Sequence, residues 1–176
     1  CYGRNTANAW LVLEYIDLKQ ATKQSYRTLG ENLAALHHIN AEQFGWFRDN
    51  TIGATPQNNQ LSSDWIDFWR HQRLGYQLQL AKQQGYGGKL QQLGEKLLTN
   101  LDSFFTDQSI VPALLHGDLW GGNCAFDQSG QPVIYDPAVY YGDREADLAM
   151  TELFGGFPSE FYAAYQATYP LDSGYK

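Results

Sequence analysis

The stretch that decides the fold runs from Leu114 to Pro137 and reads LLHGDLWGGNCAFDQSGQPVIYDP. In it, Asp118 follows an apolar run and a glycine, and Asn123 comes five residues later. Asp136 directly follows the apolar triplet Val-Ile-Tyr. Two carboxylates and one carboxamide at this spacing are typical of a site that transfers a phosphoryl group with the help of a metal ion.

The segment between Asn123 and Asp136 has the composition of a β-hairpin. Residues 127–132 read DQSGQP and are dense in turn formers, and a short run of mostly apolar residues lies on either side of them. We therefore expect residues 124–126 and 133–135 to pair as two short strands. Such a hairpin would carry Asn123 and Asp136 back to one point.

The three polar side chains would have different tasks. Mg²⁺ prefers oxygen ligands, which Asp136 and the side-chain oxygen of Asn123 can supply. Asp118 must stay ionised near the acceptor hydroxyl, where it orients the nucleophile and takes its proton. Taken alone, the His-Gly-Asp turn has a structural alternative, in which Gly117 supplies a permissive backbone and Asp118 an Asx-type hydrogen bond. The spacing of all three residues favours the catalytic interpretation.

The motifs HGDLWGGN (116–123) and VIYDP (133–137) resemble those of the fructosamine kinase, or ketosamine kinase, family, a branch of the aminoglycoside phosphotransferase and protein-kinase-like fold. Similarity extends over nearly the whole chain, in LVLEYI (11–16), FGWFRDNTIGATPQNN (44–59), WIDFWRHQRL (65–74) and GDREADLAM (142–150). The resemblance implies an α+β fold, namely the mainly helical C-terminal lobe of a protein-kinase-like structure with a short catalytic-loop β-hairpin.

The resemblance also implies an activity. It is the ATP-dependent phosphorylation of a sugar hydroxyl of fructosamines or ketosamines, in protein deglycation or ketosamine metabolism, with ATP and Mg²⁺ as cofactors. Asp118 would act as the base, and Asn123 and Asp136 would hold the metal. A small-molecule or glycated-amine substrate is the expected partner.

Other residues receive roles from the same resemblance. Glu14, Tyr15 and Ile16 would form the hinge between two lobes and bind the nucleotide together with Asp136. For this segment, a strand end that leads into a helix is the alternative. Trp120 would contact the substrate beside Asp118, and its alternative is to fill the underside of the loop.

Two residues are expected to support the site. His116 belongs to the catalytic loop itself, and Asp147 would hold that loop through hydrogen bonds to its backbone. The alternative for Asp147 is a solvent-facing acid on a helix.

The resemblance divides the chain into two parts. Residues 1–18 would be the last strand of the N-terminal lobe and the hinge, and residues 19–176 a helical acceptor and catalytic lobe that is truncated at its C-terminus. The glycine-rich loop that covers the phosphates and the strand lysine of such kinases are not found in the sequence. We therefore expect the N-terminal lobe to be largely absent and this fragment to be inactive alone.

Apolar periodicity and capping residues predict the remaining elements. A buried strand is expected at 9–13, and helices at 25–39, from Ser62 or Ser63 to about 80, at 90–105, at 144–154 and from Pro158 onward. We expect a largely buried second helix and a core role for the leucines of the third. His37 and His38 are attributed to the favourable C-terminal end of the first helix.

Residues 40–60 are rich in Asn, Gln, Gly and Thr and are expected to form an irregular loop. Its Asp49, Asn50 and Thr51 could approach the substrate. A role in packing is the equal alternative.

Composition limits the possible partners and compartments. A net charge of -7 with only 12 lysines and arginines argues against nucleic-acid binding and against an anionic membrane surface. Two cysteines make neither a disulfide framework nor a zinc pattern, and no apolar run approaches the roughly 20 residues needed to span a bilayer. We expect a cytoplasmic protein and leave its oligomeric state open.

Two other functions fit parts of the pattern. One is a kinase for another small hydroxylated acceptor, such as an aminoglycoside or a choline-like molecule. The other is a kinase-like binding module without catalysis. The presence of Asp118, Asn123 and Asp136 together favours an enzyme.

Overall fold

The computed structural model describes residues 2–105, 110–172 and 174–175. Its helices are α1 (Lys23–His37), α2 (Trp65–Phe68), α3 (Gly75–Gln83), α4 (Lys89–Thr99), α5 (Glu145–Leu153) and α6 (Ser159–Thr168), with a π-helical stretch η1 (Trp69–Leu74) and a 3-10 turn η2 (Leu101–Phe104). Its strands are β1 (Tyr2–Arg4), β2 (Ala9–Leu11), β3 (Leu18–Lys19), β4 (Asn50–Ile52), β5 (Thr55–Gln57), β6 (Ala113–Leu115), β7 (Cys124–Asp127), β8 (Pro132–Ile134) and β9 (Tyr140–Gly142). The predicted α+β class is confirmed.

The strands form small antiparallel sheets in the orders β1-β2, β3-β7-β8, β4-β5 and β6-β9. The β7–β8 pair is the predicted hairpin, with Cys124 opposite Ile134, and Tyr135 lies just beyond its end. The β6–β9 pair places Leu115, the last residue before the predicted catalytic loop (116–123), opposite Tyr140. Backbone pairing therefore connects both halves of the Leu114–Pro137 stretch to the rest of the fold.

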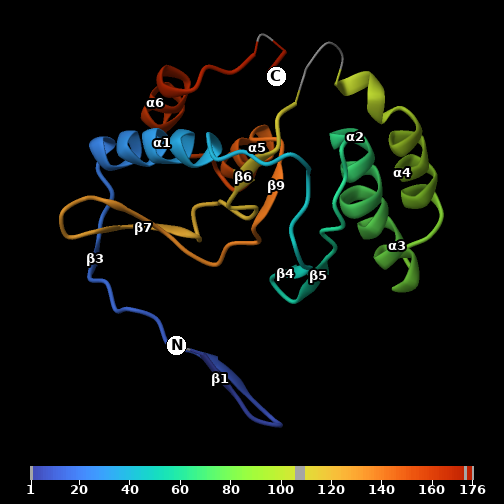
Figure 1. The fold of residues 1–176 in the computed structure, drawn as a ribbon, viewed down its shortest axis with the longest axis horizontal. Helices are drawn as coiled ribbons and strands as arrows, with labels where there is room; N and C mark the ends of the chain where they lie inside the picture. Colours follow the sequence, from blue (N-terminus) through green and yellow to red (C-terminus); the bar gives the residue numbers. More distant parts are fainter. Residues whose placement is uncertain (1, 106–109, 173, 176) are drawn as a thin grey trace.

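Two groups of helices flank these sheets (Figure 1). Helices α1 and α6 lie side by side above the β7 hairpin, and α2, α3 and α4 form a second group on the other side. Each group has its own buried cluster. The first comprises Leu29, Leu33, Ala34, Leu119, Cys124, Phe126, Leu148, Phe157, Phe161 and Tyr165, and the second comprises Phe44, Trp65, Phe68, Ala113, Leu115 and Tyr140.

Helix α1 confirms the predicted amphipathic helix. It spans Lys23–His37, which begins and ends two residues before the expected range of 25–39. Thr22 caps its N-terminus, with its hydroxyl oxygen accepting from the backbone N–H of Ser25 at 3.1 Å. Leu29 and Leu33 are buried, and Gly30 lies where α1 closely approaches α6. A Cβ atom at Gly30 would overlap the carbonyl oxygen of Phe161.

The strand expected at 9–13 is confirmed at Ala9–Leu11, but its predicted burial is wrong. Strand β2 pairs only with β1, and this hairpin extends away from the body of the molecule (Figure 1). The side chains of Leu11, Val12 and Leu13 are 60 to 67% exposed. Apolar density in the sequence indicated burial, but burial also requires a packing partner, and none of the described segments covers this hairpin.

The third predicted helix differs in two ways. It ends at Thr99, and the separate turn η2 follows it. Leu90, Leu93 and Leu97 are exposed, contrary to the core role expected for them. The reason is geometric, because α4 approaches α3 through the small Gly94, against which Leu78 packs, and its leucine face points elsewhere.

Other predicted boundaries also change. The second helix is capped by Asp64, whose carboxylate accepts from Asp67 N–H, and not by Ser62 or Ser63. It is only partly buried beyond Phe68. The region expected to be an irregular loop, 40–60, contains the β4–β5 hairpin. None of the helices in the described part of the chain is long and apolar enough to cross a membrane.

We predict that Gly30→Ala destabilises the intact protein by about 1–3 kcal/mol, because the added methyl group must push α6 away from α1. Chemical denaturation measures the change in the free energy of unfolding. Gly87→Ala is the matched control, because no atom lies within 4 Å of the position of its Cβ. Equal stability of the two variants would contradict the close packing of α1 on α6.

Candidate active site

The catalytic loop begins where β6 ends, and its first residues have a defined hydrogen-bond pattern. Gly117 has a φ of 81°, a left-handed conformation that glycine adopts without strain. The backbone N–H of Asp118 donates to His116 Nδ1 at 3.3 Å, and His116 Nε2 lies 2.9 Å from the carbonyl oxygen of Tyr135. A carbonyl only accepts, so the proton of His116 is on Nε2 and its Nδ1 is free to accept.

Asn123 points its amide nitrogen at the candidate base. Its Nδ2 donates to the carbonyl oxygen of Asp118 at 2.8 Å and to Asp118 Oδ2 at 3.0 Å. Because the Asp118 carbonyl can only accept, the nitrogen must face it. The Oδ1 atom of Asn123 then faces away from Asp118 and has no hydrogen-bond partner among the described residues.

The hairpin brings Asp136 to the same place. The backbone N–H of Tyr135 donates to the carbonyl oxygen of Asn123 at 3.1 Å, which joins the residue before Asp136 directly to Asn123. Asp136 is exposed and has a φ of 53°, the only positive φ of a non-glycine residue in the described part of the chain. Such a conformation is strained and is often found at functional sites.

Asp147, on α5, is hydrogen-bonded to the backbone at the start of the loop. Its two carboxylate oxygens accept from the backbone N–H groups of His116, at 2.7 Å, and Gly117, at 2.8 Å. The side chain is 1% exposed, which excludes the alternative of a solvent-facing helix acid. A third partner of this carboxylate was not predicted from the sequence.

That partner is His37. Its Nε2 lies 3.2 Å from Asp147 Oδ2, and its Nδ1 lies 2.7 Å from the hydroxyl of Tyr165 on α6. His37 lies in the last turn of α1, as predicted, but it is fully buried and has specific partners that the helix-end interpretation did not include. Its position held a signal, because residue 37 continues the four-residue spacing of the buried Leu29 and Leu33.

Trp120 packs against its own loop and is partly exposed to solvent. Its ring packs over Gly122, whose position has no room for a Cβ atom, and it meets Phe154 edge-on with 5.3 Å between ring centroids. The residue nevertheless remains 37% exposed, so part of the indole faces solvent beside Asp118. The exposed Phe154 extends this aromatic surface.

The residues expected to form the hinge make no direct bond to the three polar residues of the candidate site in the described part of the chain. In the described part of the chain, no hydrogen bond or ion pair joins Glu14, Tyr15 or Ile16 to Asp118, Asn123 or Asp136. The Tyr15 hydroxyl donates to its near neighbour Asp17 at 3.1 Å. Of the loop residues expected near the substrate, Asn50 donates to a backbone carbonyl, that of Val139, at 2.8 Å.

Cys124 follows Asn123 directly and is a buried free thiol. Burial raises the pKa of its thiol to about 11. The thiol is therefore neutral at physiological pH and packs in the core cluster that contains Leu119 and Phe126.

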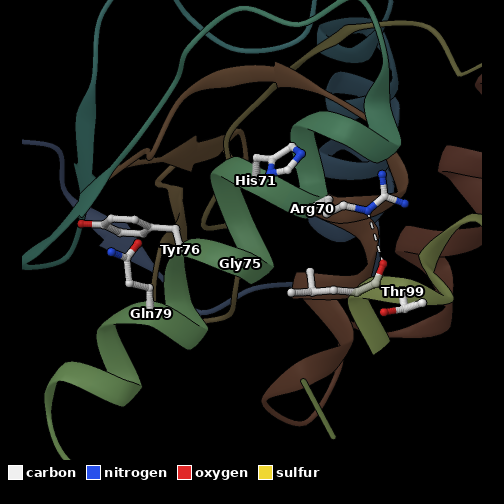
Figure 2. Close-up of a pocket in the computed structure, with 7 residues that line it drawn as sticks. Arg70, His71, Gly75, Tyr76, Gln79 and Thr99 are labelled. Atoms are coloured by element: carbon white, nitrogen blue, oxygen red, sulfur yellow. Dashed lines mark hydrogen bonds between the residues drawn. The ribbon is translucent and has the colours of Figure 1, made fainter. Parts of the chain in front are cut away.

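A cavity of about 510 Å³ lies apart from this site, between η1, α3 and the end of α4 (Figure 2). Arg70 is one of its lining residues, together with His71 and Tyr76. The guanidinium group of Arg70 already pairs with two exposed carboxylates, and its Nε donates to the carbonyl oxygen of Leu98 at 3.3 Å. No residue of the catalytic loop lines this cavity.

The fold is that of a known class of protein. A protein from Haemophilus somnus assigned as a fructosamine-3-kinase matches the structure with a TM-score of 0.89 and 30% identity, over 99% of this chain and 58% of that one. A second such protein, from Thermobifida fusca, matches with a TM-score of 0.84 and 38% identity, over 92% of this chain and 56% of its own.

The family model described as fructosamine kinase matches residues 1–176, and the chain belongs to the fructosamine kinase family. A probable ketoamine kinase of Synechocystis sp. is 46% identical over 100% of this chain and 59% of its own length. A chloroplastic protein-ribulosamine 3-kinase of Arabidopsis thaliana is 43% identical over 97% of this chain and 52% of its own length. The chain thus spans between half and three fifths of the length of these relatives.

We predict that Tyr165→Phe lowers the free energy of unfolding by about 1–3 kcal/mol, because it leaves His37 Nδ1 buried without a partner. Thermal or urea denaturation of the intact protein measures the loss. Tyr86→Phe, at an exposed hydroxyl, is the control and is expected to have no effect. A neutral Tyr165→Phe would show that the hydroxyl contributes nothing to holding His37.

Proposed function

We propose that the intact protein transfers the γ-phosphoryl group of ATP to a sugar hydroxyl of a fructosamine or another ketosamine. The observation that carries this proposal is the orientation of Asn123, whose Nδ2 donates to Asp118 while its Oδ1 has no hydrogen-bond partner among the described residues. The backbone of Asn123 is bonded to Tyr135, the residue before Asp136. The names of the related proteins, ketoamine kinase and protein-ribulosamine 3-kinase, support the same acceptor class.

Asp118 is proposed as the general base. It is half-buried in a loop that Asp147 holds, and one of its carboxylate oxygens is oriented by the Asn123 amide. This leaves its other oxygen to accept the proton of the attacking hydroxyl. Because Asp147 and His116 fix the loop without reaching that hydroxyl, we assign them structural support only.

The donor set near Asp118 fits Mg²⁺. One carboxylate, that of Asp136, and one neutral amide oxygen, that of Asn123, are hard oxygen ligands of the kind this ion takes when substrate phosphates complete its shell. In such a site the ion neutralises charge on the phosphates. Among the described residues, no group of three or more His, Cys, Asp or Glu side chains is placed to hold a metal ion by itself.

The remaining assignments extend the proposal to the two substrates. Glu14, Tyr15 and Ile16 would contact the nucleotide as an interlobe hinge, with residues 19–176 forming the acceptor and catalytic lobe. The exposed part of Trp120 would stack on the sugar of the acceptor, because an indole offers a flat apolar face beside the base.

We expect Asp118→Asn to lower kcat for ketosamine phosphorylation by about 10²–10⁴-fold, since only proton acceptance is lost from a nearly isosteric side chain. Steady-state kinetics of the intact protein with ATP and Mg²⁺ measures the change. Asp102→Asn, which alters an exposed carboxylate paired with Arg70, is the control. Undiminished turnover by Asp118→Asn would reject the base assignment, and absence of Mg²⁺-dependent ATP binding by the wild type would favour a binding module.

A panel of acceptors tests the substrate class. We expect kcat/KM to be higher for a fructosamine or ribulosamine than for an aminoglycoside or a choline-like alcohol. Trp120→Ala should raise KM for the preferred sugar, because it removes the stacking surface while Asp118 stays in place. A preference for the aminoglycoside would contradict the proposed acceptor.

A further inference from the structure

A network of side-chain amides joins the β4–β5 hairpin to the backbone just after Asp136. Gln57 Nε2 donates to the carbonyl oxygen of Ala138 at 3.0 Å, and Asn50 Nδ2 donates to that of Val139 at 2.8 Å. Gln57 Nε2 and Asn59 Nδ2 both donate to Asn50 Oδ1, at 3.0 and 2.9 Å. We call Asn50, Gln57, Asn59 and Arg73 the amide network.

The direction of donation in the amide network is determined at both ends. Arg73 Nη2 lies 2.7 Å from Asn59 Oδ1, and a guanidinium can only donate. The carbonyl groups of Ala138 and Val139 can only accept. Each amide between these ends therefore has one allowed orientation, which makes the network a rigid link and not a set of interchangeable contacts.

Arg73 anchors the far end. Its guanidinium lies over the rings of Tyr140, at 4.1 Å, and Phe68, at 4.6 Å, and it also donates to the carbonyl oxygen of Asn58. The π-helical stretch η1 presents it there, with the backbone N–H of Gly75 bonded to the carbonyl oxygen five residues earlier. A positive charge held between two rings and two oxygens has little freedom to move.

The backbone that the amide network holds also contacts the catalytic loop on its other side. The N–H of Ala138 donates to the carbonyl oxygen of His116 at 2.9 Å, and the carbonyl oxygen of Ala138 lies so close to Gly117 that no Cβ would fit there. Asp136, two residues earlier, holds a left-handed φ of 53° that needs support from its surroundings. Residues 136–139 are thus held between the loop and the amide network.

We propose that the amide network is a positioning device that sets the carboxylate of Asp136 relative to Asn123, and that Gln57 and Asn50 are positioning residues for metal binding. This inference rests on the proposed function, in which Asp136 binds the metal. On this inference, the segment 44–59 supports the proposed metal ligand Asp136 and does not contact the substrate. It also explains why two buried amides, those of Gln57 and Asn59, lie under an exposed hairpin.

Gln57→Glu is the sharpest test, because it keeps the shape of the side chain while placing a carboxylate oxygen against the carbonyl of Ala138 and against Asn50 Oδ1. Gln60→Glu adds the same charge at an exposed position of the same segment and serves as the matched control. Asn50→Asp, which replaces the donor to Val139 by a carboxylate oxygen while keeping an acceptor for Gln57 and Asn59, is a second variant in case the first folds poorly. All are made in the intact protein.

Two quantities are measured on each variant. Binding of Mn²⁺ together with ATP is followed by electron paramagnetic resonance, and the Mg²⁺ concentration needed for half-maximal turnover is measured at saturating ATP and acceptor. We expect Gln57→Glu and Asn50→Asp to weaken Mn²⁺ binding by about 10–100-fold, as loss of outer-shell partners of metal ligands does. KM for the acceptor should stay near that of the wild type.

The outcomes separate the inference from the proposed function. If Gln57→Glu and Asn50→Asp, folded by circular dichroism, bind Mn²⁺ as tightly as Gln60→Glu does, the amide network only stabilises the hairpin and the inference is overturned. Recovery of turnover at high Mg²⁺ supports it, since a purely structural defect would not respond to the ion. If the wild type and Gln60→Glu themselves bind no Mn²⁺ with ATP, the proposed function fails, and the inference with it.

Discussion

The buried carboxylate of Asp147 is the interaction on which the rest of the site depends. It accepts from two successive backbone N–H groups of the catalytic loop and from His37, so one charge is shared among three donors. Hydrogen bonds to a charged group contribute about 1.5–3 kcal/mol each, and a buried carboxylate without such donors would be strongly unfavourable. The loop and α5 therefore have little freedom to separate.

This carboxylate also connects the loop to the packing of the helices. His37 is the last residue of α1, and Tyr165 lies on α6. The position of the His37 imidazole therefore depends on the close packing of these helices at Gly30. Leu119, in the loop itself, is fully buried in the same core cluster. Helix packing and loop geometry are thus coupled. A shift of α6 would change the position of Asp118 through Tyr165, His37 and Asp147.

The second side of the loop is held by different chemistry. Neutral amides and one stacked guanidinium support the segment after Asp136, where a second carboxylate would repel the candidate metal ligands. The loop that carries the proposed base is thus held by the charged carboxylate of Asp147. The segment that carries the proposed metal ligand is contacted by neutral side-chain amides. This division keeps negative charge for Asp118 and Asp136, where the proposed chemistry uses it.

The sequence by itself determined the features that depend on neighbouring residues. The β7–β8 hairpin follows from the turn formers of 127–132, α1 follows from its apolar spacing, and the approach of Asn123 to Asp136 follows from that hairpin. Only the tertiary structure decided which apolar surfaces are covered, and so the exposure of Leu11 and of the α4 leucines was not foreseen. It also decided the orientation of the Asn123 amide, the burial of His37 and the amide network. The partner of the Asn123 amide is only five residues away, but its choice depends on how the loop folds. The contacts of His37 and of the amide network join segments far apart in the chain, up to 128 residues for His37 and Tyr165, and they form only where packing brings donors to acceptors that no local pattern specifies.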